Sequence, residues 1–299
     1  MNSVIKPTSD IFVLYLLGSE KNKDLLMSFV NAVLKDKDLP LVKELTLKNP
    51  FNLKSFHSDK ESILDIKAID ENSHQFDIEI QATYDPSFAV RSLYYWAKFY
   101  SSQLKESVPY EDLKPTICIN LLDFNLLPDK NQIHSCFLLT EKNNPELVLT
   151  DHIMIHFIEI KKFKEQFKVM NPELYDWIYY FKYATEEDKM KLVIDNNKKF
   201  IQKALKVLKE FNEDDHLRDL ALSRHMYQMD KISQIKNAEK RGEKRGEKRG
   251  EKRGEKKGKI EGKIETAKTM LKLKADLDFI HQVTGLSIEE IEKLTPESL

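Results

Sequence analysis

The chain has few glycines outside one short segment, few cysteines and no long apolar run. Only Gly18 lies in the first 241 residues, which leaves the main body without a Gly-rich phosphate-binding loop. Cys118 and Cys136 both lie in apolar, strand-like segments, which predicts reduced core thiols rather than a disulfide or a metal site. No segment approaches the ~18 consecutive apolar residues of a membrane helix, and residues 1–10 lack the pattern of a secretory signal. We therefore expect a cytoplasmic protein.

Several familiar catalytic signatures are also missing. The sequence contains no HExxH pair, no Cys/His finger spacing and no G-x-S-x-G elbow. His152 and His156 are four residues apart, but they lie in a strand-like segment, where side chains share a face without converging well. This spacing favours core or surface placement over metal binding.

The composition indicates one sizeable folded body and a distinct tail. The chain has 299 residues and 41% apolar content, enough for one good-sized core and a smaller appendage. Its net charge of −1 hides an asymmetry, because residues 239–258 carry five Glu, six Lys and four Arg. Six of the eight glycines lie at regular intervals between residues 242 and 262. The main body is therefore mildly acidic, the tail is basic, and a boundary is expected near residue 237.

Hydrophobic periodicity predicts a mixed α/β order of elements. The pattern indicates helices through residue 36, a short strand within 41–50, a hairpin of strands at 61–69 and 75–84, a helix within 87–106, a buried strand at 114–124, two further strands at 134–141 and 153–163, and helices from 172 to about 237. The buried strand is a continuous apolar run, which suits a parallel sheet.

A pair of acids on the predicted hairpin is the most informative local feature. Asp65 and Glu79 each lie in an apolar-alternating segment, and the polar residues 70–74 lie between the segments. Glu79 and Gln81 share one strand face about 7 Å apart, and a carboxylate on the paired strand can meet them. Such oxygen ligands suit a hard cation such as Mg²⁺.

The plainer alternative is a hairpin with one solvated face, in which half the positions are polar. On that basis Asp77 and Lys67 are expected to be outward, solvated residues. Spacing alone does not separate a metal site from this alternative.

Three segments together resemble a known family. Residues 49–70, 76–104 and 114–128 are similar, in the same order, to the Rpn family of recombination-promoting nucleases, also described as transposases, of the PD-(D/E)XK superfamily. The resemblance runs from about Pro7 to Phe163 and resumes weakly in the tail. It implies a restriction-endonuclease-like core, in which helices flank a mixed sheet.

The resemblance also implies DNA cleavage assisted by Mg²⁺ or Mn²⁺. Asp65 and Glu79 would be metal ligands, and the backbone carbonyl of Ile80 would be a further ligand. A bound divalent cation offsets charge that develops on the phosphate and lowers the pKa of the attacking water. Gln81 occupies the position where the superfamily usually has lysine. An amide neither titrates nor carries positive charge, so Gln81 could orient water or phosphate without deprotonating it.

Asp10 is a third candidate acid. Its ordinary role is to cap the first helix or to lie in its first turn, where a carboxylate accepts free backbone N–H groups. The resemblance adds a second role as a metal ligand, and the two roles can coexist.

The helix after the hairpin carries candidate DNA-binding residues. Arg91 and Lys98 are seven residues apart, so they share a helical face and could contact successive phosphates. Gln103 lies where superfamily members often have a substrate-facing glutamine. The aromatic residues between them, Trp96 and Phe99 in particular, are expected to pack against the sheet.

The tail combines a Gly-Glu-Lys-Arg repeat with a small helical module. Each glycine costs about 1 kcal/mol inside a helix, so the repeat is expected to be a fraying helix or a tether. Its basic excess would add salt-sensitive attraction to phosphates. Ser287 and Glu290 predict a capping box for a final helix. The last two helices suit a helix-turn-helix, but the final one is acidic, which favours self-association over DNA binding.

We expect four segments: a nuclease core at 1–163, a helical extension at 164–237, the repeat at 238–263 and the module at 264–299. The expected function is Mg²⁺-dependent DNA endonuclease activity, linked to recombination or mobile elements. Two alternatives remain open, namely a catalytically inactive nuclease-fold protein that binds DNA or assembles, and cleavage of RNA. A homo-oligomer formed through the module is the expected protein partner.

Overall fold

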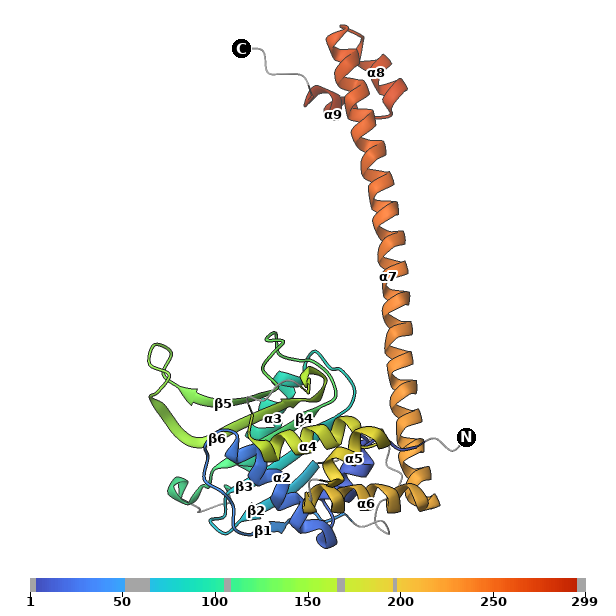
Figure 1. The fold of residues 1–299 in the computed structure, drawn as a ribbon. Helices are drawn as coiled ribbons and strands as arrows, with labels where there is room; N and C mark the ends of the chain where they lie inside the picture. Colours follow the sequence, from blue (N-terminus) through green and yellow to red (C-terminus); the bar gives the residue numbers. More distant parts are fainter. Residues whose placement is uncertain (1–3, 52–64, 105–108, 166–169, 196–197, 295–299) are drawn as a thin grey trace. The chain divides into compact units, whose positions relative to one another are not determined.

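The computed structural model describes residues 4–51, 65–104, 109–165, 170–195 and 198–294. The chain divides into two compact units, Met1–Tyr227 and Gln228–Leu299. The first unit has the predicted mixed α/β architecture, a six-stranded sheet flanked by helices (Figure 1). The first part of the predicted hairpin, residues 61–64, lies outside the described residues.

The sheet has the strand order β1-β2-β3-β4-β6-β5. Its strands are β1 (Leu45–Leu47), β2 (Asp65–Asp70), β3 (Gln75–Gln81), β4 (Thr116–Leu122), β5 (His134–Thr140) and β6 (Val148–Glu159). β2 is antiparallel to β1 and β3, and β5 is antiparallel to β6, whereas β4 runs parallel to both β3 and β6. Every residue of β4 is buried, which confirms the expected buried strand. Its parallel pairing with both neighbours confirms the expected parallel sheet.

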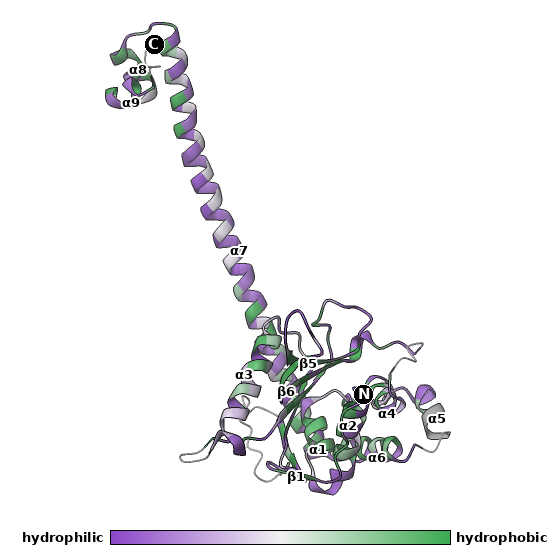
Figure 2. Cartoon of the chain, turned by 90° about the vertical axis from the view of Figure 1, so that its left-hand side faces the viewer, coloured by the Kyte–Doolittle hydropathy of each residue, from purple (hydrophilic) through white to green (hydrophobic). Residues whose placement is uncertain are grey.

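Helices cover both faces of the sheet. They are α1 (Asp10–Leu17), α2 (Lys23–Lys35), α3 (Phe88–Ser101), α4 (Pro172–Tyr183), α5 (Glu187–Asp195) and α6 (Lys199–Glu213), with short 3₁₀ turns at Glu20–Asn22, Tyr110–Asp112 and Ile160–Lys162. Figure 2 shows α3 on one side of the sheet and α1, α2, α4, α5 and α6 on the other. The sequence explains where α4 begins. The Asn171 side chain caps the helix by accepting a hydrogen bond from the Glu173 amide, and Pro172 is its first residue.

The main core lies between the sheet and the helices on the side opposite α3. Phe29, Trp177 and Phe181 pack there edge to face or stacked, with ring centroids 5.7 to 5.8 Å apart. A smaller apolar cluster on the α3 side includes Phe88 and Cys118. Cys118 is buried, Cys136 is half-buried, and both are free thiols, as the sequence predicted.

The expectation that Asp77 is a solvated residue was wrong. Its relative exposure is 6%, because the face that carries it lies under α3 rather than in water. Burial raises the pKa of Asp77 to about 7, and the charge of Asp65 adds to the shift. Its Oδ1 atom has no hydrogen-bond partner among the described residues. Lys67, also expected outside, is half-buried, and its Nζ lies 2.8 Å from Asp65 Oδ2.

A buried polar chain links α2 to the edge of the sheet. Asp36 Oδ2 lies 2.7 Å from His134 Nδ1, and His134 Nε2 lies 3.0 Å from His156 Nδ1. On the far side, Cys136 Sγ lies 3.7 Å from His156 Nε2. His156 is therefore in the core, one of the two placements expected for it. Burial lowers the pKa of His156 to about 3, and the neighbouring His134 adds to this shift.

The second unit begins within a long helix. α7 (Asp215–Lys272) is continuous through all the repeat glycines, whereas the sequence predicted a fraying helix or a tether. A Cβ added at each glycine from Gly242 to Gly262 would meet nothing within 4 Å, so no close contact requires glycine at these positions. Pairs such as Glu255 with Lys259, 2.6 Å apart at i,i+4, favour the helix.

A small apolar cluster closes the second unit. It joins the end of α7 to α8 (Leu277–Thr284) and α9 (Ile288–Glu292) around Ala267, Ile280 and Ile291. The capping box of Ser287 and Glu290 is present as predicted. Gly285 ends α8 with φ +66°, a conformation that glycine adopts without strain. Across the described residues of both units, no helix has the length and apolar character needed to span a membrane.

Asp77→Asn should stabilise the fold in a pH-dependent way. The Asp77 carboxyl ionises at about pH 4 in the unfolded chain and at about pH 7 in the folded chain. The parent protein therefore loses stability as pH rises from about 4 to about 7. Without added metal, the variant should gain about 1–3 kcal/mol of unfolding free energy over the parent at pH 8 and little at pH 4.5. Urea denaturation measures both. The matched control is Asp188→Asn, whose side chain is 98% exposed; an equal gain from both variants would contradict the burial argument.

His156→Gln should flatten the acid side of the stability profile. The unfolded histidine takes up a proton near pH 6.5 and the folded one only near pH 3, so the parent loses stability as pH falls through that window, by up to about 1.4 kcal/mol per pH unit. The slope of unfolding free energy between pH 6.5 and 4.5 should be shallower in the variant. His216→Gln, at an exposed position, should keep the parent slope. Identical slopes in all three proteins would rule out this role of His156.

Candidate functional site

The hairpin register brings the two predicted acids together. Asp65 on β2 lies directly opposite Glu79 on β3, and Lys67 lies opposite Asp77. Because alternate residues of a strand point to the same face, these side chains and that of Gln81 project from one face of the sheet. The face is the one that α3 covers. Ile80 points the other way into the main core, so only its backbone lies between Glu79 and Gln81.

Glu79 lies in a place where its charge is costly. Its side chain is 13% exposed, and burial raises its pKa to about 7. The cation of Arg91 opposes this shift, while the negative charge of Asp65 adds to it. Asp65 is similarly shielded, with 15% of its side chain exposed, and it is paired with Lys67. Each of the two acids therefore has one cationic neighbour.

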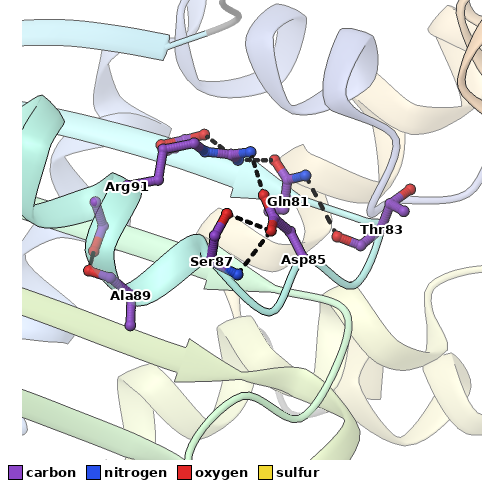
Figure 3. A network of polar contacts seen from close by, with 8 residues as sticks. Gln81, Thr83, Asp85, Ser87, Ala89 and Arg91 are labelled. Atoms are coloured by element: carbon purple, nitrogen blue, oxygen red, sulfur yellow. Dashed lines mark hydrogen bonds and ion pairs between the residues drawn. The ribbon is translucent and has the colours of Figure 1, made fainter. Parts of the chain in front are cut away.

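Arg91 reaches from α3 to the acid-bearing strand (Figure 3). Its Nη2 lies 3.0 Å from Gln81 Oε1 and 3.5 Å from Glu79 Oε1, and its Nη1 donates to Asp85 Oδ2 at 2.6 Å. The other Asp85 oxygen accepts hydrogen bonds from the Ser87 amide at 2.8 Å and hydroxyl at 2.7 Å. Partial burial opposes ionisation of Asp85, but these hydrogen bonds and the Arg91 charge hold its pKa below the usual value.

Asp10 is the first residue of α1, which confirms its expected place in the first turn. Its Oδ1 accepts from the Ile11 amide at 2.9 Å, and its Oδ2 accepts from Arg224 Nε at 3.0 Å. Two residues earlier, the Thr8 hydroxyl lies 3.3 Å from Asp123 Oδ2, and the Asp123 amide donates to the Gln81 carbonyl. The start of α1 therefore lies at the Gln81 end of β3.

Two further predicted DNA-binding residues are Lys98 on α3 and Gln103, two residues past the end of that helix. Lys98 is exposed. The Gln103 side chain donates to the Lys114 carbonyl and accepts from the Lys114 amide, both at 3.0 Å, and it also donates to Thr116 Oγ1. Thr116 pairs with Gln75, which is four residues before Glu79 on β3. Gln103 therefore lies near the opposite end of β3 from Glu79 and Gln81.

The aromatic residues of α3 are only partly core residues. Trp96 and Phe99 are both half-buried. Trp96 packs on the smaller cluster and donates its indole N–H to the Thr116 carbonyl at 3.0 Å, whereas Phe99 lies 5.1 Å from Lys67 Nζ, measured to the ring centroid. The predicted packing against the sheet is therefore present without full burial.

Sequence reasoning missed Lys67, Asp85 and Arg224. Lys67 carried a usable signal, because it is two residues from Asp65 on the same strand and must share its face. Asp85 carried a weaker one, since Asp-x-Ser before a helix is typical of a turn in which the acid accepts local N–H bonds. Arg224 had none, because 214 residues separate it from its partner.

The carboxylate pair fits a hard divalent cation with few protein ligands. Within the parts of the chain that the structure describes, no group of three or more His, Cys, Asp or Glu side chains is arranged to hold a metal. Two facing carboxylates remain, Asp65 and Glu79. Mg²⁺ commonly uses one or two carboxylates and takes its other ligands from water and substrate phosphates, so this donor set suits it.

Comparison with known proteins identifies the family. The model of the PD-(D/E)XK nuclease family transposases matches residues 7–238. Neither a curated protein nor a solved structure matches the chain. The match covers most of the chain and includes the whole sheet and both acids, which confirms the resemblance expected from the sequence. The chain belongs to the PD-(D/E)XK nuclease family of transposases.

Proposed function

We propose that this protein is a Mg²⁺- or Mn²⁺-dependent DNA endonuclease. The observation that carries the proposal is the direct pairing of Asp65 with Glu79 on one half-shielded sheet face. These carboxylates would hold the cation, with the Ile80 carbonyl as a further ligand and Asp10 as a candidate on the adjoining helix. A bound cation supplies positive charge at the phosphate and activates the attacking water.

Hydrolysis would form one bond and break one. The water oxygen adds to phosphorus and gives up a proton to solvent, one P–O ester bond breaks, and the departing oxygen takes up a proton from solvent, so the products carry a phosphate and a hydroxyl. Asp65 and Glu79 need not exchange protons in this scheme; their task is to fix the cation beside the scissile phosphate. Lys98 on exposed α3 surface, and Gln103, are proposed to contact the DNA. The family name supports a role for cleavage in recombination or in mobile elements.

A catalytically silent DNA-binding or assembly protein is the second candidate. It is favoured by Gln81, which replaces the usual lysine, and by the cations that already pair with both acids, Lys67 with Asp65 and Arg91 with Glu79. A cation partner can stabilise a buried carboxylate without any metal.

A cleavage assay separates the two candidates. Supercoiled plasmid is incubated in Mg²⁺ with the parent, Asp65→Asn, Glu79→Gln and the surface control Glu173→Gln, whose ion pair with Lys35 is exposed. Mutation of a residue that only hydrogen-bonds to a metal ligand often lowers activity 10- to 100-fold. Mutation of a ligand itself should cost more, so each site variant should cut at least about 100-fold more slowly than the parent. Equal cutting by all four proteins would exclude the site, and no cutting by the parent would favour the silent scaffold. The same series on RNA tests the remaining substrate.

We also propose self-association through the helices of residues 264–299. Phe279 and Val283 are four residues apart on α8 and are 55% and 53% exposed, which forms an apolar strip on a small module. Phe279→Glu should shift the full-length protein toward the monomer in light scattering coupled to size exclusion. A parent that is already monomeric at micromolar concentration would contradict the proposal.

A further inference from the structure

The position of Gln81 leaves the candidate site without the lysine charge that the motif usually supplies. Phosphodiester hydrolysis concentrates negative charge on the phosphate oxygens in the transition state, and a preorganised cation nearby stabilises that charge. Gln81 carries no charge. Its amide oxygen, however, is engaged by a residue that does, the Arg91 guanidinium at 3.0 Å.

Three partners on β3 and the following turn define the place of that guanidinium. Asp85 holds Nη1, and Gln81 and Glu79 both lie near Nη2. The Asp85 carboxylate is itself fixed by two hydrogen bonds from Ser87. Figure 3 shows this chain of contacts from Ser87 through Asp85 and Arg91 to Gln81. The metal-binding candidate Glu79 lies 3.5 Å from the same guanidinium.

Aromatic rings and partial burial orient the same group. Arg91 Cζ lies 4.7 Å from the centroid of the Phe88 ring and 5.8 Å from that of Tyr95, within the range of cation–π attraction. The side chain is 29% exposed, so solvent and a substrate can reach it. Its Nε is buried and has no hydrogen-bond partner in the described parts of the chain, which leaves one donor of the guanidinium uncommitted.

We infer that Arg91 is a catalytic residue that supplies the positive charge of the missing lysine, and that Gln81 and Asp85 are the residues that position it. The inference rests on the proposed nuclease function. Arginine stays charged and offers several donors in a fixed plane, which suits phosphate oxygens. A lysine at position 81 would repel Arg91, whereas a glutamine oxygen accepts its hydrogen bond. The glutamine and the arginine therefore belong together.

Two other roles for Arg91 predict different behaviour. As an ordinary DNA contact, it would contribute to binding of the ground state and of the transition state alike, so its loss would lower affinity rather than the rate of the bound complex. If Arg91 only joins α3 to β3, its loss would lower stability without slowing cleavage by the folded protein. Lys67 is a less suitable replacement for the lysine, because it pairs with Asp65 and lies opposite Asp77, on the side of Glu79 away from Gln81.

The test uses full-length Arg91→Gln, Gln81→Lys and the double variant. Lys35→Gln is the control, since it removes a cation from an exposed ion pair outside the site. Three quantities are measured for each: the single-turnover cleavage rate of one DNA duplex in Mg²⁺, the affinity for that duplex in Ca²⁺, and the affinity for Mn²⁺ alone by calorimetry.

Arg91→Gln should slow single-turnover cleavage about 100-fold while changing duplex affinity less than about threefold. Adding Gln81→Lys should restore at least about tenfold of that loss, because a lysine returns the charge to the motif position. Mn²⁺ should bind several-fold more tightly to Arg91→Gln, since a cation 3.5 Å from Glu79 is removed. Lys35→Gln should match the parent in all three measurements.

Several outcomes would overturn the inference. They are full activity of Arg91→Gln, an equal loss of duplex affinity and rate, unchanged Mn²⁺ affinity, or no rescue by Gln81→Lys. If Arg91→Gln melts early, Arg91→Met replaces it, because methionine fills the space beside Phe88 and Tyr95 without charge. A parent that cleaves nothing defeats the proposed function and the inference with it, whereas an active parent with an equally active Arg91→Gln defeats the inference alone.

Discussion

The antiparallel register of β2 and β3 is the constraint on which the candidate site depends. It sets Asp65 opposite Glu79. Because side chains alternate between faces, a slip of one residue would carry Asp65 into the main core and Ile66 out of it. The apolar residues of the other face, such as Phe76 and Ile78, are almost completely buried and therefore fix this register. Packing on one face thus determines the placement of charge on the opposite face.

A single helix, α3, gives the charged face its chemical character. By covering it, α3 removes Asp77 and Glu79 from water and raises the pKa of both to about 7, mainly through burial. The same helix brings Arg91 to Glu79. Burial of like charges opposes folding, and groups that are unfavourable for stability in this way are typical of functional sites.

The buried histidine chain and the long helix show how differently polar residues are accommodated elsewhere. His134 and His156 can be buried because both nitrogens of each ring have a polar partner. The chain of contacts runs from Asp36 through the two rings to Cys136. The repeat of α7 is instead fully solvated, so its stability rests on local backbone and i,i+4 interactions. The glycine cost suggested a fraying helix or a tether, whereas the structure has a continuous helix, because intrinsic helix propensity is only a weak predictor.

The sequence by itself determined the order of elements, the buried parallel strand, the paired acids and the capping box of Ser287 and Glu290. These follow from local periodicity and short spacing, which the chain carries in adjacent residues. Only the tertiary structure decided that Asp77 is buried, that Arg91 joins Glu79 and Gln81, and that Asp10 meets Arg224. A one-sided polar strand has the same pattern whether water or a helix covers it, and contacts between distant segments leave no local signal.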